Sequence, residues 1–118
     1  MDGGRERRVH KRVPVNLTGE LEYDGTLRQA IILDLSMGGA QMQCAGFEWP
    51  APGTPMMLCL SLGARKISLL SKVARLNTQD HRAGLCFEPM GNACETLLAR
   101  LVYTQDVKHM KAHLHLLD

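Results

Sequence analysis

Six short segments of alternating apolar and polar residues, separated by turn residues, constrain the fold of this chain more than any other feature. Successive residues of a β-strand point to opposite faces of a sheet, so a period of two predicts strands with one buried face. Several such strands at regular spacing are typical of a barrel or a two-sheet sandwich. The predicted strands cover residues 13–23, 27–35, 40–44, 56–62, 67–76 and 83–88.

The turns between these segments carry signals of their own. Asp24-Gly25 is the strongest hairpin signal, because a tight turn needs positive φ angles that glycine adopts without steric conflict. The run 36–39 interrupts the alternation, and the Pro- and Gly-rich stretch 47–55 predicts a surface loop. Within the first segment, Gly19 is a candidate for a β-bulge.

The end of the chain changes from the period of a strand to that of a helix. Apolar residues there recur three and four positions apart, namely Leu97, Leu98, Leu101 and Val102. Such spacing places them on one face of a helix. Asn92 is a suitable N-cap, with Glu95 three residues later. We therefore expect a helix over residues 92–117 that packs on the mouth of the strand assembly.

The length and the first residues bound the number of domains and the compartment. A chain of 118 residues, 45% of them hydrophobic, can close one core but hardly two. No run approaches the roughly 20 apolar residues of a membrane span, and the charged start lacks the apolar segment of a secretory signal. We expect one cytoplasmic domain over residues 5–118 after a disordered stretch at 1–4.

The cysteines are far apart in the sequence and form no C-x-x-C pair. They are Cys44, Cys59, Cys86 and Cys94, and each stands among apolar residues. In a reducing compartment, this pattern favours buried free thiols over a zinc site or disulfides.

The positive charge of the chain is concentrated near its start. Residues 5–12 hold five basic residues and one acid, whereas the formal net charge of the whole chain is only +2. The remainder is therefore mildly acidic. A local basic cluster suits a compact anionic ligand better than a long nucleic acid, which usually needs a basic surface spread across the fold.

Two arginines four positions apart, Arg8 and Arg12, precede the first strand, and Asp34, Ser36 and Gly39 follow the second. This pair of patterns resembles the PilZ domain family, whose members carry R-x-x-x-R followed by D/N-x-S-x-x-G. Each pattern alone is common, but the two at this separation and in this strand context are much more specific. The resemblance extends from about residue 5 to residue 101 and so covers most of the chain.

The resemblance implies a mainly all-β fold, a six-stranded antiparallel barrel over residues 13–90 with a C-terminal α-helix over 92–117. Residues 5–12 then form an arm in front of the barrel. The function it implies is that of a receptor for the bacterial second messenger cyclic di-GMP, without catalytic activity, cofactor or metal. The ligand residues it implies are Arg7, Arg8, Arg12, Asp34, Ser36, Gly38 and Gly39.

The side chains of this set suit such a ligand on chemical grounds. Guanidinium groups match both phosphate oxygens and the O6/N7 edge of guanine. The Asp34 carboxylate can accept hydrogen bonds from guanine N–H groups, and Gly39 permits a close approach of the backbone. An arginine at position 7 is similar to family members that take two stacked ligand molecules per chain. Because the arginines lie on an arm, ligand binding could order the arm and change the surface offered to an unidentified output protein.

Two other classes of function compete with the receptor hypothesis. One is a ligand-independent protein-interaction module with the same fold, whose contact surface would include Trp49, the methionines or the terminal helix. The other is a small RNA- or DNA-binding barrel, against which the aromatic content of 4% argues, because few bases would find a ring to stack on. Trp49 itself is interpreted either as a cap on the core or as an anchor for a partner.

Enzymatic and metal-binding functions have weaker support. The sequence contains no nucleophile elbow and no Gly-rich phosphate loop, so we expect no enzyme. His109, His113 and His115 lie near the C-terminus, and His109 and His113 share a helix face. Without an acidic or cysteine partner nearby, they are interpreted as residues of a solvent-exposed helix rather than as metal ligands.

Overall fold

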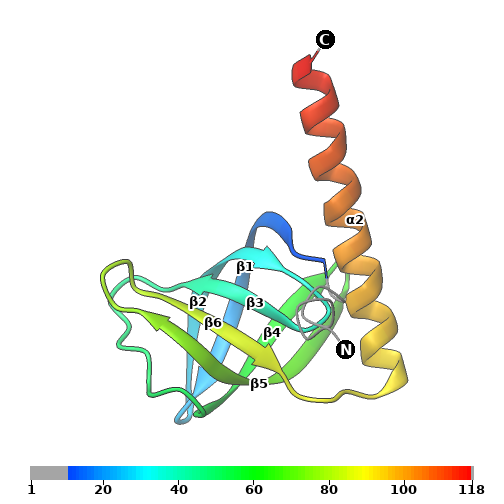
Figure 1. Ribbon diagram of the computed structural model, residues 1–118. Helices are drawn as coiled ribbons and strands as arrows, with labels where there is room; N and C mark the ends of the chain where they lie inside the picture. The colour runs from blue at the N-terminus through cyan, green and yellow to red at the C-terminus, as the bar shows by residue number, and fades with distance from the viewer. Residues whose placement is uncertain (1–10, 118) are drawn as a thin grey trace, which may run out of the picture.

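The computed structural model describes residues 11–117, with side chains up to residue 112, and this part of the chain folds into six strands followed by a long helix (Figure 1). The elements are β1 (Val13–Tyr23), β2 (Thr26–Leu35), β3 (Gly39–Gln43), β4 (Pro55–Leu62), β5 (Arg65–Asn77), β6 (Arg82–Phe87) and α2 (Asn92–Leu117). Both ends of every predicted strand lie within two residues of the ends of an observed strand. Most differences are one or two exposed or half-buried residues that extend the strand pairing beyond the apolar alternation, whereas Cys44 and Glu88 fall just outside β3 and β6.

The six strands close into an antiparallel barrel in the order β1-β2-β3-β6-β5-β4. The hairpins β1–β2 and β4–β5 pair over most of their lengths, whereas β1 closes onto β4 only from Glu20 to Glu22. The predicted fold, a six-stranded antiparallel barrel with a C-terminal helix, is confirmed. The Asp24-Gly25 turn is also confirmed, since its φ angles of 54° and 74° are the positive values that a two-residue hairpin requires.

The barrel interior is filled by the apolar member of each alternating pair of residues. Fully or almost fully buried residues come from every strand and include Leu21, Ile32, Met42, Leu58, Leu69 and Leu85. Their burial supplies the main stabilising term, because apolar surface removed from water contributes about 25 cal/mol per Å². The alternating apolar residues of the strands thus form one continuous core.

Gly19 occupies one of the inward positions, and the predicted bulge at this residue is wrong. A Cβ there would lie 3.1 Å from Ile32 Cδ1 and 3.2 Å from Leu58 Cδ1, so the missing side chain makes room for residues that meet across the barrel. Gly19 keeps regular pairing with β2, and the irregularity in β1 lies instead between Pro14 and Leu17.

Aromatic residues close the end of the barrel at which the β1–β2 hairpin lies. The Phe47 ring packs edge to face against Tyr23 and Trp49, with ring centroids 6.2 and 5.0 Å away. The Trp49 indole N–H donates a hydrogen bond to the His81 carbonyl at 2.9 Å. The half-buried Trp49 is therefore fixed as a cap over the core.

The helix α2 stands beside the other end of the barrel and extends well past it (Figure 1). Leu98 and Leu101 are buried against the core. The N-cap falls one residue earlier than predicted, because the Gly91 carbonyl accepts the first helical hydrogen bond, from the Glu95 N–H at 2.9 Å. Within residues 11–117, no helix has the length and apolar character needed to cross a lipid bilayer.

The expectation of four buried thiols is wrong for three of the cysteines. Cys44 is buried, but Cys59 and Cys94 are half-buried and Cys86 is exposed. Cys59 and Cys86 fall on the outward phase of β4 and β6, so apolar neighbours in sequence face away from them. Burial raises the pKa of the Cys44 thiol, and the positive charge of Arg28 opposes this shift only in part.

Candidate ligand-binding groove

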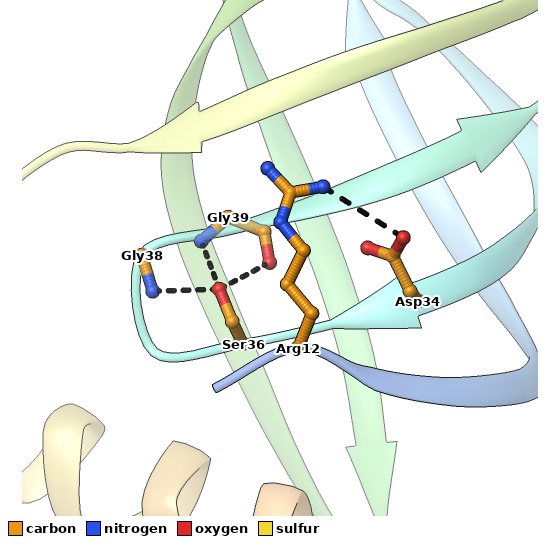
Figure 2. A network of polar contacts seen from close by, with 5 residues as sticks. All are labelled: Arg12, Asp34, Ser36, Gly38 and Gly39. Atoms are coloured by element: carbon orange, nitrogen blue, oxygen red, sulfur yellow. Dashed lines mark hydrogen bonds and ion pairs between the residues drawn. The ribbon is translucent and has the colours of Figure 1, made fainter. Parts of the chain in front are cut away.

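The turn between β2 and β3 is organised around the hydroxyl of Ser36 (Figure 2). The Ser36 Oγ accepts hydrogen bonds from the backbone N–H groups of Gly38 and Gly39, both at 3.1 Å, and donates to the Gly39 carbonyl at 3.3 Å. The Ser36 N–H donates to the same carbonyl at 2.9 Å. Serine favours such local turns. This hydroxyl therefore fixes the shape of the turn.

The same turn is held tightly against β6. The Gly38 carbonyl accepts a hydrogen bond from the Phe87 N–H at 2.9 Å. At Gly39, a Cβ would overlap the carbonyl oxygen of Leu85 and lie 3.3 Å from the carbonyl carbon of that residue. A backbone atom cannot swing aside as the end of a side chain can. Glycine is therefore the residue that this contact between β3 and β6 requires.

Asp34 faces outward because β2 contains a β-bulge. Ala30 and Ile32 point into the barrel, and strict alternation would turn Asp34 inward as well. The register of β2 against β3 shifts between Ile32 and Asp34, where Leu33 is an extra residue. The alternation of inward and outward side chains is shifted by one residue from this point on, so Leu35 is buried and the Asp34 carboxylate is partly exposed.

Arg12, directly before β1, reaches this carboxylate (Figure 2). Its Nη1 lies 3.8 Å from the Asp34 Oδ2, and the two side chains are 58% and 28% exposed. The distance is too long for a direct hydrogen bond, and exposed ion pairs contribute at most about 1 kcal/mol. The two groups are close enough to contact one ligand and held loosely enough to turn toward it.

A shallow groove of about 440 Å³ begins at Arg12 and the Ser36–Gly39 turn and continues over β3, β6 and β5. Small residues line much of it: Gly38, Gly39, Ala40, Ala74 and Gly84. Side chains of this size leave the backbone accessible and the surface flat. The groove can therefore admit planar rings close to the main chain.

Arg75 on β5 brings a second guanidinium to the groove, and sequence reasoning missed it. A Cβ at Gly84 would lie 3.8 Å from the Arg75 Nε, so the arginine lies against the space that this glycine leaves open. The register of β5 against β6 shifts between Val73 and Arg75 and pairs Arg75 with Gly84. An arginine in an alternating strand looks like an ordinary solvent-facing residue, and only the pairing with β6 reveals its place.

The structure brings most of the predicted ligand residues to one place. Within the described part of the chain, Arg12, Ser36, Gly38 and Gly39 line the start of the groove. Asp34 contacts Arg12 but does not itself line the groove. Arg7 and Arg8 lie outside the described residues.

The electrostatic character of the groove follows from its two arginines. Arg12 and Arg75 are its only charged lining residues in the part of the chain that the structure describes. Each presents a planar fork of donors that fits phosphate oxygens or the edge of a purine. The arrangement suits an anionic ligand with flat rings, with the Asp34 carboxylate nearby as an acceptor.

Comparison with known proteins agrees with this architecture. The model of the PilZ domain family matches residues 6–104. A search of curated proteins gave no match. Among solved structures, the PilZ domain of CeSA from a cellulose synthesizing bacterium is similar, with a TM-score of 0.65 and 22% identity, over 80% of this chain and 96% of that one.

Two further structures with this fold were solved with a nucleotide. The PilZ domain of YcgR from Escherichia coli, with c-di-GMP, has a TM-score of 0.74 and 12% identity over 91% of this chain and 97% of that one. The PlzA protein of Borreliella burgdorferi, in complex with c-di-GMP, has a TM-score of 0.61 and 17% identity over 81% of this chain and 41% of that one. The family model covers most of the sequence and the barrel has the fold of these structures, so the chain belongs to the PilZ domain family.

Proposed function

We propose that this chain is a non-catalytic receptor for cyclic di-GMP, which binds in the groove and changes the interaction of the chain with an output protein. The observation that carries the proposal is the convergence of Arg12, Asp34 and the Ser36–Gly39 turn at the start of a groove whose charged lining residues are arginines. The c-di-GMP complexes of YcgR and PlzA, which share the fold, support the choice of ligand.

Each residue has a role that its chemistry and its place suggest. The Arg12 guanidinium pairs with a phosphate or with the O6/N7 edge of a guanine, and Asp34 accepts hydrogen bonds from guanine N–H groups. The Ser36 hydroxyl contributes by holding the turn, with Gly38 and Gly39, in the conformation that the ligand meets. Arg75 contacts the part of the ligand that lies over β5 and β6.

Arg7 and Arg8 complete the site from the arm formed by residues 5–12. Together with Arg12 and Arg75 they supply four positive charges, one for each phosphate of two stacked ligand molecules, and Arg7 is the residue that selects this mode. The expected stoichiometry is therefore two ligand molecules per chain.

The arm is also the element that transmits binding. Lys11 at its end forms an ion pair with Asp106 of α2, at 3.1 Å between Nζ and Oδ2, and Arg12 beside it faces the ligand groove. Movement of Arg12 toward a ligand acts on a segment that also contacts the helix. The surface made by the arm and α2 then differs between the free and bound states, and the output protein recognises that difference.

Isothermal titration calorimetry of the chain with cyclic di-GMP, beside GTP, GMP and cyclic di-AMP, tests the proposal. Binding of cyclic di-GMP alone at micromolar concentration or below is the expected result. Arg12→Ala should weaken it by about 10- to 100-fold, because a charge-assisted hydrogen bond contributes about 1.5–3 kcal/mol. Arg65→Ala, an exposed arginine at the start of β5 and outside the groove, is the matched control.

Two results would count against the proposal in different ways. Unchanged affinity in an Arg8→Ala, Arg12→Ala double variant would show that the ligand binds elsewhere. The absence of any binding heat and of any competition would favour the ligand-independent interaction module.

A further inference from the structure

The helix α2 carries two apolar stripes that face in different directions. The first stripe, which includes Leu98 and Leu101, is buried against the core of the barrel. Among the side chains that the structure describes, the apolar residues of α2 packed on the core end at Val102. The second stripe begins at Tyr103, which is 70% exposed, and includes Met110, which is 51% exposed. The barrel therefore covers the first stripe and leaves the second one open.

The second stripe has the spacing of a coiled coil. Its members among the described side chains are Tyr103, Val107 and Met110, which follow one another at steps of four and three residues. The sequence continues the same steps with Leu114 and Leu117. An average repeat of 3.5 residues keeps an apolar stripe turned toward one partner helix along its whole length. The stripe thus covers about two heptads.

The place of the second stripe on the molecule allows two copies to meet through it. Successive residues of an α-helix are rotated by about 100°, so Tyr103 points almost opposite to Leu101, which packs on the barrel. This part of α2 also extends past the barrel (Figure 1). Two helices paired along the stripe would therefore hold their barrels on opposite sides of the pair.

The projecting part of α2 also needs packing for its own stability. A helix of fewer than about 12–15 residues is marginal in water, and most helices in proteins are stabilised by packing of an apolar face. Residues of low helix propensity, such as Thr104, Val107 and His109, occur in this part. A second helix laid on the stripe would supply the missing packing.

The charges beside the stripe identify the partner. Asp106 flanks it on one side and Lys111 on the other. In a parallel pair of helices, each flank faces the opposite flank of the other helix, so Asp106 of either copy meets Lys111 of the other. An antiparallel pair would bring like flanks together. An anionic membrane surface would repel the Asp106 carboxylate at the edge of the stripe.

We propose that a second copy of this chain pairs with this one along the second stripe of α2, in parallel and in register. The apolar stripe drives the association, and the Asp106–Lys111 pairs set its orientation, because exposed ion pairs contribute little to affinity. The Asp106 Oδ2 already binds Lys11 of its own chain at 3.1 Å, but a carboxylate accepts several donors, so both pairings can coexist. Two heptads make the association weak.

Sedimentation equilibrium of the ligand-free chain, from about 10 µM to about 1 mM, covers the range of a weak but specific association. We expect a monomer–dimer equilibrium. Met110→Glu should weaken it by about tenfold or more, because the pair would bury two carboxylates. His109→Glu is the matched control, since it introduces the same residue at an exposed neighbouring position outside the stripe, and it should leave the association unchanged. Both positions are exposed, so both variants should keep the wild-type Tm at low concentration.

Charge reversal tests the parallel orientation. Asp106→Lys should weaken the dimer by about 3- to 10-fold, and the addition of Lys111→Glu should restore it. Only side chains three and four residues apart meet on one helix, so recovery between positions five apart arises between copies. The single and the double variant both lose the ion pair with Lys11, so this loss cannot explain the recovery.

Three results would each overturn the proposal. They are a wild-type chain that stays monomeric at every concentration, a dimer that Met110→Glu leaves intact, and a double variant that associates no better than Asp106→Lys alone. If the monomeric chain instead bound vesicles of anionic phospholipid, and Met110→Glu abolished this binding, the second stripe would belong to a membrane surface rather than to a second copy.

Discussion

Substitution of Gly39 by alanine tests the geometry of the groove most directly. The new Cβ would overlap the Leu85 carbonyl oxygen and lie 3.5 Å from the Cys86 Cα, so β3 and β6 must separate where Gly39 pairs with Cys86. Separation also strains the hydrogen bond from the Phe87 N–H to the Gly38 carbonyl, which is 2.9 Å long. Because the clash involves backbone on both sides, no change of rotamer can relieve it.

The magnitude of the effect combines two destabilising terms and one stabilising term. Overpacking in a well-packed site costs about 1–3 kcal/mol, and a weakened backbone hydrogen bond adds about 1 kcal/mol. Against this, alanine lowers the entropy of the unfolded chain relative to glycine, a gain of about 0.4–1 kcal/mol. We expect a net loss of about 2–3 kcal/mol in the free energy of unfolding. For a domain of this size, such a loss lowers Tm by about 8–12 °C.

Thermal and urea unfolding followed by circular dichroism measure this loss. Gly84→Ala on the neighbouring strand is the matched control, because its Cβ would meet its nearest atom, Gln41 Oε1, at an ordinary contact distance of 3.6 Å. The control should change the unfolding free energy by less than about 1 kcal/mol. If Gly39→Ala were as stable as Gly84→Ala, the tight contact of β3 with β6 would not exist in solution, and the reasoning would fail.

Other predictions concern the ligand, the helix and the thiols. Arg75→Ala should weaken cyclic di-GMP about tenfold in calorimetry without lowering Tm, and unchanged affinity would place the ligand away from β5. Leu98→Ala should lower the free energy of urea unfolding by about 2–5 kcal/mol because Leu98 is fully buried, whereas Tyr103→Ala, at a residue that is 70% exposed, should lower it little. Equal effects would contradict the packing of α2. Iodoacetamide at mildly alkaline pH should alkylate Cys86 long before Cys44 in mass spectrometry, because burial shields the Cys44 thiol and raises its pKa; the reverse order would contradict the barrel register. Because the pKa of Cys44 is raised in the folded state, its neutral thiol contributes its full stabilisation of the fold at pH values below the ordinary thiol pKa. This contribution decreases as the pH rises above that value, because the unfolded chain loses the thiol proton first.

The parts of the fold that follow from local rules were predictable from the sequence. Alternation located the strands, the Asp24-Gly25 pair located the hairpin, and the change of period located α2. Closure of the strands into a barrel required the resemblance to a family, since regular spacing alone also allows a sandwich. The cap of α2 was misplaced by one residue because asparagine and glycine are both accepted at a helix start.

The features that pairing between strands decides were not predictable from the sequence. The extra residue Leu33, which turns Asp34 outward, has no local signal, and neither does the register shift that pairs Arg75 with Gly84. Gly19 looked like a bulge because sequence does not show which side chains meet across a barrel. The predicted ligand residues could be named from the sequence because they form compact motifs, whereas Arg75 belongs to the groove only through the pairing of β5 with β6.

The closed order of the strands limits the ways in which another protein can attach to this one. An open sheet offers a row of backbone groups to any extended segment, largely without regard to sequence. In this barrel each strand has a neighbour on both sides, so most of those backbone groups are already used. A partner must read side chains, loops or the projecting part of α2. A few surface residues then determine which partner protein binds, and relatives with the same barrel can acquire different partners without any change of fold.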